Sequence, residues 1–221
     1  MIDVTHMVPR HDIVCGSITL ERAIDGFPPG TTHLAVIDPG VGTNRRLLVV
    51  EINKQLAICP DNGLITWAWR RMGPAKAHEL TWRPPKALSS HVFHGRDILA
   101  PVAAMLAAGE SVSHLTLPID DPILLDITPA AEPASGGQII HFDHFGNATT
   151  NINHEVLRSL RGRSFRVKGR SVGKLKRTYW DVAPGKPLAL VGSSGLLEIA
   201  VRDGSAAEEL KLTVGDEVEI R

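Results

Sequence analysis

The sequence has little of what would assign it to several protein classes. Its 221 residues include two cysteines, Cys15 and Cys59, and a single tyrosine. The cysteines form no Cys-x-x-Cys pair, which disfavours a disulfide framework and predicts two buried, reduced thiols in a cytoplasmic protein. No apolar run is long enough to cross a bilayer, and the first residues lack the pattern of a signal peptide.

The sequence also lacks an excess of charge of either sign. The 24 Lys and Arg residues balance 24 Asp and Glu residues, so no global field favours a nucleic acid or an anionic membrane as partner. The most basic stretch, 158–177, has few aromatic residues and is interpreted as a solvated face. We therefore expect a small-molecule ligand, with no nucleic acid and no membrane as partners.

The patterning predicts two domains of different class. Apolar strand-like runs alternate with helical segments up to about residue 120, which predicts an α/β layered domain with a central, mostly parallel sheet over 1–120. The proline-rich stretch 121–136 is interpreted as a linker. Short strands separated by turns follow, and they predict an all-β barrel domain over 137–221. The expected helices are 13–24, 64–71 and 98–109, and the expected strands are 33–37, 47–52, 56–59, 138–143, 148–152, 165–168, 188–191, 196–201 and 217–220.

The stretch AVIDPGVGTNRR, residues 35–46, has glycines but does not match a phosphate-binding loop. Arg45 stands where the dinucleotide fingerprint has its third glycine, and a strand-like run follows instead of a helix. Taken alone, Asp38 followed by Pro39 is most often the start of a plain turn. Two more polar corners, PDNG at 60–63 and FHGRD at 93–97, also flank apolar elements. The three corners are candidates for a single site.

Two other clusters leave alternatives open. His91 and His94 with Asp97 resemble part of a metal site, but no HExxH pattern is present and we predict no metal. Asp143 lies on the strand face opposite to the following histidine, where it is free to bind an amine. The sequence VGSSG around Ser194 is not a nucleophile elbow; it is either a hairpin turn or a group of donors for a carboxylate.

Six segments, in this order, resemble the S-adenosylmethionine (SAM) hydroxide adenosyltransferases, which are relatives of the fluorinating and chlorinating enzymes. The segments are IDVTHMVPRHDI, FPPGTTHLAVIDPGVGTNRR, CPDNGLI, VFHGRDILAPVAA, FDHFGNATTNI and GSSGLLEIAVRDGSAAEEL. The resemblance implies an N-terminal α/β domain, a C-terminal β-barrel and a homotrimer with active sites at subunit interfaces. It also implies attack of water-derived hydroxide on C5′ of the ribose, which releases methionine and forms adenosine without a cofactor.

The resemblance implies that Asp38, Arg45 and His94 form the catalytic set. Water is a weak nucleophile, and a neutral histidine can take or orient its proton while Arg45 holds the carboxylate of Asp38; the residues leave open which member takes the proton. The implied substrate contacts are Asp143 to the methionine ammonium, Ser194 to its carboxylate, Phe145 and Asn147 to the adenine, and the backbone from Arg202 to Gly204 to the adenine edge.

The same comparison separates hydroxide from halide chemistry. The halogenating relatives have tyrosine at the position of Asp38 and serine at the position of Gly95. Family members also have a strand and a Thr-Asp-Phe-Gly corner, which holds the ribose hydroxyls, before the segment resembling IDVTH; the resemblance here starts at Ile2, without that unit. The alternatives are therefore a member that binds SAM or adenosine without turnover, and a chloride-dependent halogenase, which Gly95 disfavours.

Overall fold

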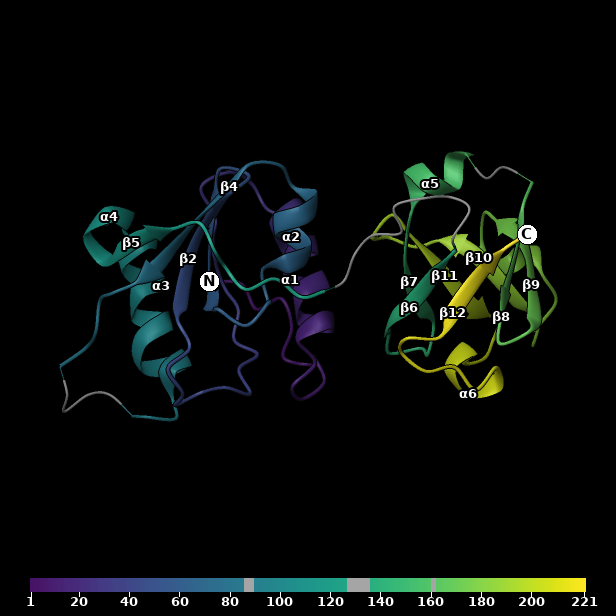
Figure 1. Ribbon diagram of the computed structural model, residues 1–221, viewed down its shortest axis with the longest axis horizontal. Helices are drawn as coiled ribbons and strands as arrows, with labels where there is room; N and C mark the ends of the chain where they lie inside the picture. The colour runs from purple at the N-terminus through teal and green to yellow at the C-terminus, as the bar shows by residue number, and fades with distance from the viewer. Residues whose placement is uncertain (86–89, 127–135, 160–161) are drawn as a thin grey trace. The chain divides into compact units, whose positions relative to one another are not determined.

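The computed structural model describes residues 1–85, 90–126, 136–159 and 162–221. The chain divides into two compact units, Met1–Leu125 and Asp126–Arg221 (Figure 1). Most of the expected linker, residues 127–135, lies outside the described residues. None of the helices in the described part of the chain is long and apolar enough to cross a membrane.

The first unit is built on a five-stranded sheet of order β1-β3-β2-β4-β5. The parallel pairing is that of β1 with β3, whereas β3 with β2, β2 with β4 and β4 with β5 are antiparallel. The sheet is therefore mixed, and the expectation of a mostly parallel sheet is not confirmed. The strands are β1 (Thr32–Leu34), β2 (Leu47–Ile52), β3 (Gln55–Pro60), β4 (Ala75–Leu80) and β5 (Thr116–Ile119).

The antiparallel pairing of β2 with β3 follows from a two-residue turn. Asn53 and Lys54 join β2 to β3, and both have positive φ angles, 49° and 59°. Positive φ at both central residues is typical of the type I′ turn, whose twist matches a hairpin. So short a connection can join only antiparallel strands, because parallel neighbours need a crossover of a dozen or more residues.

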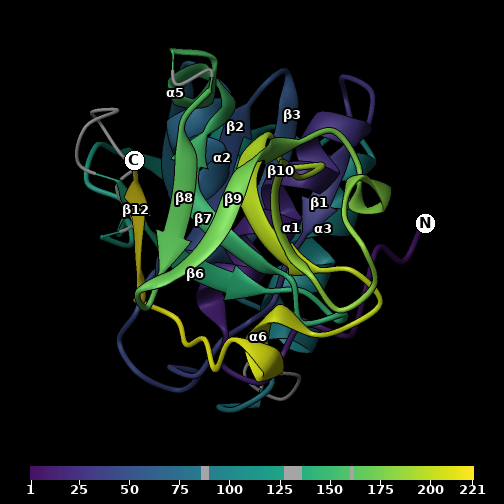
Figure 2. The same cartoon turned by 90° about the vertical axis from the view of Figure 1, so that its right-hand side faces the viewer.

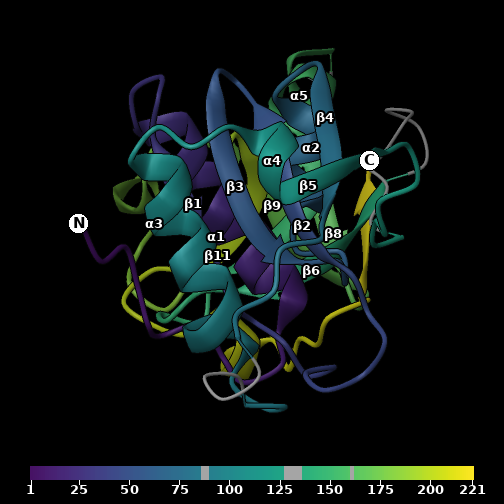
Figure 3. The ribbon, with the colours of Figure 1, turned by 90° about the vertical axis from the view of Figure 1, so that its left-hand side faces the viewer.

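Helices cover both faces of this sheet. Leu48 and Val50 pack with α1 (Ile13–Gly26) and α2 (Thr66–Arg71) on one face. Alternate residues of β2, such as Val49, pack on the other face with α3 (Ala100–Ala107), which lies on the viewer's side of the sheet in Figure 3. Asp12 accepts a hydrogen bond from the backbone N–H of Cys15 at 2.8 Å and so caps α1. Cys15 and Cys59 are both buried, as predicted, and neither forms a disulfide with a described residue.

The second unit is a closed barrel of order β10-β11-β7-β6-β12-β8-β9 (Figure 2), which confirms the prediction of a barrel. Two short helices, α5 (His154–Ser159) and α6 (Ala206–Glu209), accompany its strands. Its core contains Phe165, Val167, Leu197 and Ile199. The strands are β6 (Gly137–Phe142), β7 (Ala148–Asn153), β8 (Ser164–Val167), β9 (Arg170–Lys176), β10 (Pro187–Val191), β11 (Leu196–Val201) and β12 (Glu217–Ile220).

Candidate active site

The segment after β1 forms the turn that its sequence predicts. The backbone N–H of Val41 donates to the carbonyl of Asp38 at 3.3 Å, which closes a four-residue turn with Pro39 in its second position. Gly42 has a φ of 84°, and a Cβ there would lie 3.1 Å from the carbonyl oxygen of His91. The glycine therefore allows this loop to pack closely against the segment that leads to His94.

Asp38 and Arg45, at the two ends of this loop, form a buried ion pair. Nε of Arg45 donates to Oδ1 of Asp38 at 2.6 Å, and Nη2 donates to Oδ2. The exposed fractions of the two side chains are only 8% for Arg45 and 5% for Asp38. A bidentate pair of this kind holds both planar groups in one orientation, and removal of either partner would leave a buried charge uncompensated.

His94 contacts the same guanidinium. Nη1 and Nη2 of Arg45 each lie 3.2 Å from Nδ1 of His94. Because a guanidinium has donors only, Nδ1 must accept, and the proton of the neutral ring then lies on Nε2. Burial, followed by the charge of Arg45, lowers the pKa of His94 below its ordinary value, although Asp38 opposes this. The imidazole is therefore neutral at pH 7.

Asp97 supports the loop before His94. Its Oδ2 accepts the backbone N–H of Ser90 at 2.8 Å, and its Oδ1 accepts Nε of Arg96 at 2.6 Å. These hydrogen bonds lower the pKa of Asp97 to about 2, and the bond from Arg96 has the larger effect. Asp97 lies inside the π-helix Gly95–Leu99, which continues into α3. Within the described residues, no group of three potential metal ligands includes His94, His91 or Asp97.

In the barrel unit, Asp143 organises the loop between β6 and β7. Its Oδ1 accepts the backbone N–H groups of Phe145 and Asn147, both at 2.9 Å. Its Oδ2 accepts the side-chain amide of Asn147, also at 2.9 Å. The ring of Phe145 is exposed, with 74% of the residue accessible. The loop therefore presents a carboxylate, an amide and an aromatic face within five residues.

The two segments that are expected to contact the adenine are hydrogen-bonded to each other. The backbone N–H of Ala207 donates to the carbonyl of Gly146 at 2.9 Å, which joins the segment after Gly204 to the Phe145 loop. Arg202 directs its side chain elsewhere, with Nη1 donating to the carbonyl of Val182 and the guanidinium 3.8 Å from the ring centroid of Trp180. Its backbone is paired as well: its N–H donates to the carbonyl of Lys186 at 3.1 Å, and its carbonyl accepts the N–H of Gly185 at 2.8 Å.

Ser194 lies in the turn between β10 and β11, where the backbone N–H of Gly195 donates to the carbonyl of Gly192 at 2.9 Å. The prediction of a hairpin turn is confirmed there, and Ser194 is 6% exposed. On the neighbouring strand, Glu198 accepts the hydroxyl of Tyr179 at 2.6 Å. The sequence reasoning missed this pair, although a glutamate inside the apolar run LLEIAV was a usable signal.

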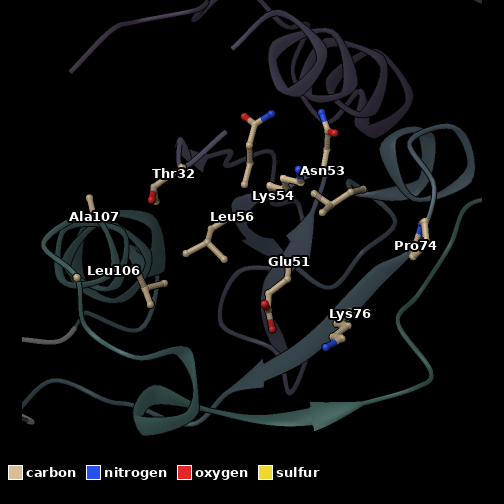
Figure 4. A pocket seen from close by; sticks show the side chains of 13 residues that line it. Thr32, Glu51, Asn53, Lys54, Leu56, Pro74, Lys76, Leu106 and Ala107 are labelled. Carbon is tan, nitrogen blue, oxygen red and sulfur yellow. The ribbon is translucent and has the colours of Figure 1, made fainter. Parts of the chain in front are cut away.

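The first unit also contains a separate cavity of about 460 Å³ (Figure 4). Glu51, Lys54 and Lys76 line it, around the β2–β3 turn, and Glu51 accepts Nε2 of His78 at 2.9 Å. Asp38 follows the end of β1, whereas this cavity is lined by Thr32 at the start of β1. The cavity therefore belongs to the opposite end of the sheet and includes none of the expected site residues.

Sequence comparison assigns both parts of the chain to one family. The family model for the SAM hydroxide adenosyltransferase N-terminal domain matches residues 1–116, and the model for the C-terminal domain matches residues 137–219. The (R)-S-adenosyl-L-methionine hydrolase of Salinispora tropica is 38% identical over 226 residues, covering 100% of this chain and 85% of the relative. The enzyme of the same name from Thermus thermophilus is 37% identical, covering 97% and 85%.

Solved structures agree with this comparison. An uncharacterized conserved protein from Thermotoga maritima superimposes with a TM-score of 0.89 at 34% identity, covering 100% of this chain and 88% of that one. A conserved hypothetical protein from Thermus thermophilus has a TM-score of 0.84 at 36% identity, covering 100% and 86%.

Proposed function

The chain belongs to the SAM hydroxide adenosyltransferase family, and we propose that it hydrolyses (R)-S-adenosyl-L-methionine to adenosine and L-methionine. The hydrogen-bonded cluster of Asp38, Arg45 and His94 is the observation that supports this most strongly. It supplies buried, oriented groups for a water molecule. The leaving group needs no further activation, because the positive charge of the sulfonium already activates it.

The geometry supports a division of roles within the cluster. Arg45 occupies Nδ1 of His94, so Nε2–H is the ring donor that can orient the oxygen of the attacking water. The carboxylate oxygens of Asp38 have further lone pairs, which can accept a hydrogen of that water. Bulk water has a pKa of about 15.7, so its proton passes to the carboxylate of Asp38 as the C5′–O bond forms. The C5′–S bond breaks at the same time, and its electron pair stays on the sulfur of the departing methionine. In-line positioning then supplies much of the rate.

The barrel residues suit the rest of the substrate. Asp143 has the charge for the methionine ammonium, and the turn at Ser194 offers a hydroxyl and backbone donors for the carboxylate. Phe145 offers an exposed ring for the adenine to stack on, and the amide oxygen of Asn147 is the acceptor that an exocyclic amino group needs. The backbone from Arg202 to Gly204 completes the proposed adenine contact.

We further propose a homotrimer in which each site combines Asp38, Arg45 and His94 of one chain with the barrel residues of the next. This assembly rests on the family resemblance. It explains why the expected contacts divide between two compact units, with the catalytic set in Met1–Leu125 and the substrate contacts in Asp126–Arg221.

The test is an assay of the protein with SAM in ¹⁸O-labelled water. We expect equimolar adenosine and methionine, with the label in the 5′-hydroxyl of adenosine, because water attacks carbon and not sulfur. Asp38→Asn should abolish turnover, whereas Asp120→Asn, at an exposed position outside the cluster, should not. Absence of adenosine with the unmodified protein would refute the proposal, and tight adenosine binding without turnover would favour the binding alternative.

Gly95 favours hydroxide over halide chemistry in this chain. A Cβ at Gly95 would lie 3.1 Å from Cγ1 of Val36, so a serine there requires Val36 to move. Because the family resemblance associates glycine at this position with hydroxide chemistry, we expect the same rate of adenosine formation with and without chloride. A chloride-dependent 5′-chloro product would favour the halogenase alternative.

A further inference from the structure

The corner after β3, Asp61 and Asn62, contacts the backbone on both sides of the catalytic loop. In the sheet, β3 lies between β1 and β2. Asp38 follows β1 and Arg45 precedes β2, so the end of β3 adjoins both stems of the 38–45 loop. Neither Asp61 nor Asn62 has a side-chain hydrogen bond to Asp38, Arg45 or His94 among the interactions of the described residues.

Asn62 holds the stem before Asp38. Its Nδ2 donates to the carbonyl of Ile37 at 2.8 Å, and its Oδ1 accepts the backbone N–H of Leu64 at 3.2 Å. The carbonyl of Ile37 belongs to the peptide plane that also contains the nitrogen of Asp38. Fixing that plane therefore limits the directions in which the Asp38 side chain can point.

Asp61 holds the stem after Arg45. Its backbone N–H donates to the carbonyl of Arg46 at 3.0 Å, and its Oδ2 accepts Nε of Arg46 at 2.7 Å. Its Oδ1 accepts the backbone N–H of Ile123 at 2.7 Å. The residue is 1% exposed. Arg46 is thus held through both its backbone and its side chain, directly beside Arg45.

We infer that Asp61 and Asn62 are positioning residues for the reaction, because together they set the spacing and orientation of Asp38 and Arg45. Asn62 is the more informative of the two, since it is only partly buried and makes its contact with Ile37 through one amide group. A displacement of about 1 Å at a reacting group can reduce a rate on the order of 100-fold. The expected loss of rate rests on the proposed function.

The variant Asn62→Leu removes the donor to Ile37 at nearly constant side-chain size. We expect kcat to fall by roughly 10- to 100-fold while KM for SAM changes less than about threefold, because the misplaced groups act on water and not on substrate binding. The matched control is Gln55→Met. Gln55 lies at the other end of β3, where its amide donates to the carbonyls of Ile24 and Phe27 and its oxygen pairs with Nε2 of His33. Its loss therefore removes a similar amide without touching the 38–45 loop.

A second measurement does not require turnover. The charge of Asp38 raises the pKa of His94, so a displaced Asp38 should shift the NMR titration of His94 to lower pH in Asn62→Leu but not in Gln55→Met. The signal is assigned by its loss in His94→Gln. If Asn62→Leu does not fold, Asn62→Ser is measured in its place, with the same expected results.

The results distinguish a failure of the positioning role from a failure of the proposed function. An active unmodified protein with unchanged kcat and unchanged His94 titration in the Asn62 variant would overturn the inference, as would equal losses of kcat in the Asn62 and Gln55 variants. Absence of adenosine formation by the unmodified protein would overturn the proposed function, while a shifted His94 titration would still support the positioning role of Asn62.

Discussion

At the scale of single residues, Arg45 determines the state of both of its partners. Its guanidinium is the one group that contacts Asp38 and His94 together in the described residues, with two bonds to the carboxylate and two contacts to Nδ1 of the ring. A planar fork can do this, whereas a point charge on a flexible chain cannot. Activity should therefore depend on the shape of the side chain at position 45 as well as on its charge.

This leads to a prediction for Arg45→Lys. The ammonium keeps the positive charge but cannot make the bidentate pair with Asp38 while also contacting His94, so we expect kcat to fall on the order of 100-fold. Arg22→Lys, at an exposed position on α1, is the matched control and should retain full activity. Comparable rates for Arg45→Lys and Arg22→Lys would show that the fork geometry is unimportant.

The lowered pKa of His94 predicts how activity depends on pH. The role proposed for the ring requires the neutral form, so activity should be lost when His94 is protonated. Burial and Arg45 lower its pKa, so the acid limb of the kcat/KM profile should lie below the ordinary histidine value of about 6.5. A limb at or above that value in a pH–rate profile would contradict the assignment.

The same shift has a consequence for stability. The folded-state pKa of His94 is lower than its unfolded value, so the unfolded chain binds the proton more readily. The first unit should therefore lose stability as pH falls through the unfolded-state pKa of about 6.5, and His94→Gln should remove that part of the pH dependence. Urea unfolding of both proteins at two pH values measures the effect.

At the scale of elements, the turns and the strongly patterned segments were predictable. The Asp-Pro turn at 38–41, the cap at Asp12 and most strand cores follow from local sequence, because each depends on residues that are close in the chain. The strands β4, β5 and β9 were missed. The sequence of β4, AKAHEL, buries only Ala77 and Leu80, so its apolar signal is weak, and the neighbouring strand supplies the pairing that stabilises it.

The β2–β3 turn gives a prediction at this scale. Lys54 has a φ of 59°, a conformation that glycine adopts without strain and a side chain disfavours. We expect Lys54→Gly to be neutral or to stabilise the protein by up to about 1 kcal/mol, as the Asn-Gly preference of type I′ turns suggests. A lower urea midpoint for Lys54→Gly would contradict this, and kcat should stay unchanged because the turn lies at the opposite end of the sheet from Asp38.

At the scale of the whole molecule, the proposed trimer makes a prediction that a single-chain site does not. Asp38→Asn disables the catalytic set, and Asp143→Asn disables the barrel contact. If each site combines two chains, co-refolding the two inactive variants in equal amounts should restore about one quarter of the activity, because that fraction of sites receives both intact halves.

The control for this experiment is the same mixture without refolding, which should stay inactive. Size-exclusion chromatography with light scattering should give about three times the 23.9 kDa mass of one chain. No recovered activity from a mixture that has assembled into trimers would place the complete site within one chain and contradict the shared-site proposal.

The sequence by itself determined the two structural classes, the position of the turn at Asp38 and, through six ordered segments, the family and the identity of the candidate site residues. These follow from local patterns or from resemblance. Only the tertiary structure decided that the first sheet is mixed, that Arg45 occupies Nδ1 of His94 across 49 positions, and that Asn62 holds the peptide before Asp38. Such contacts depend on strand order, which brings distant residues together and leaves no periodic signal in the chain.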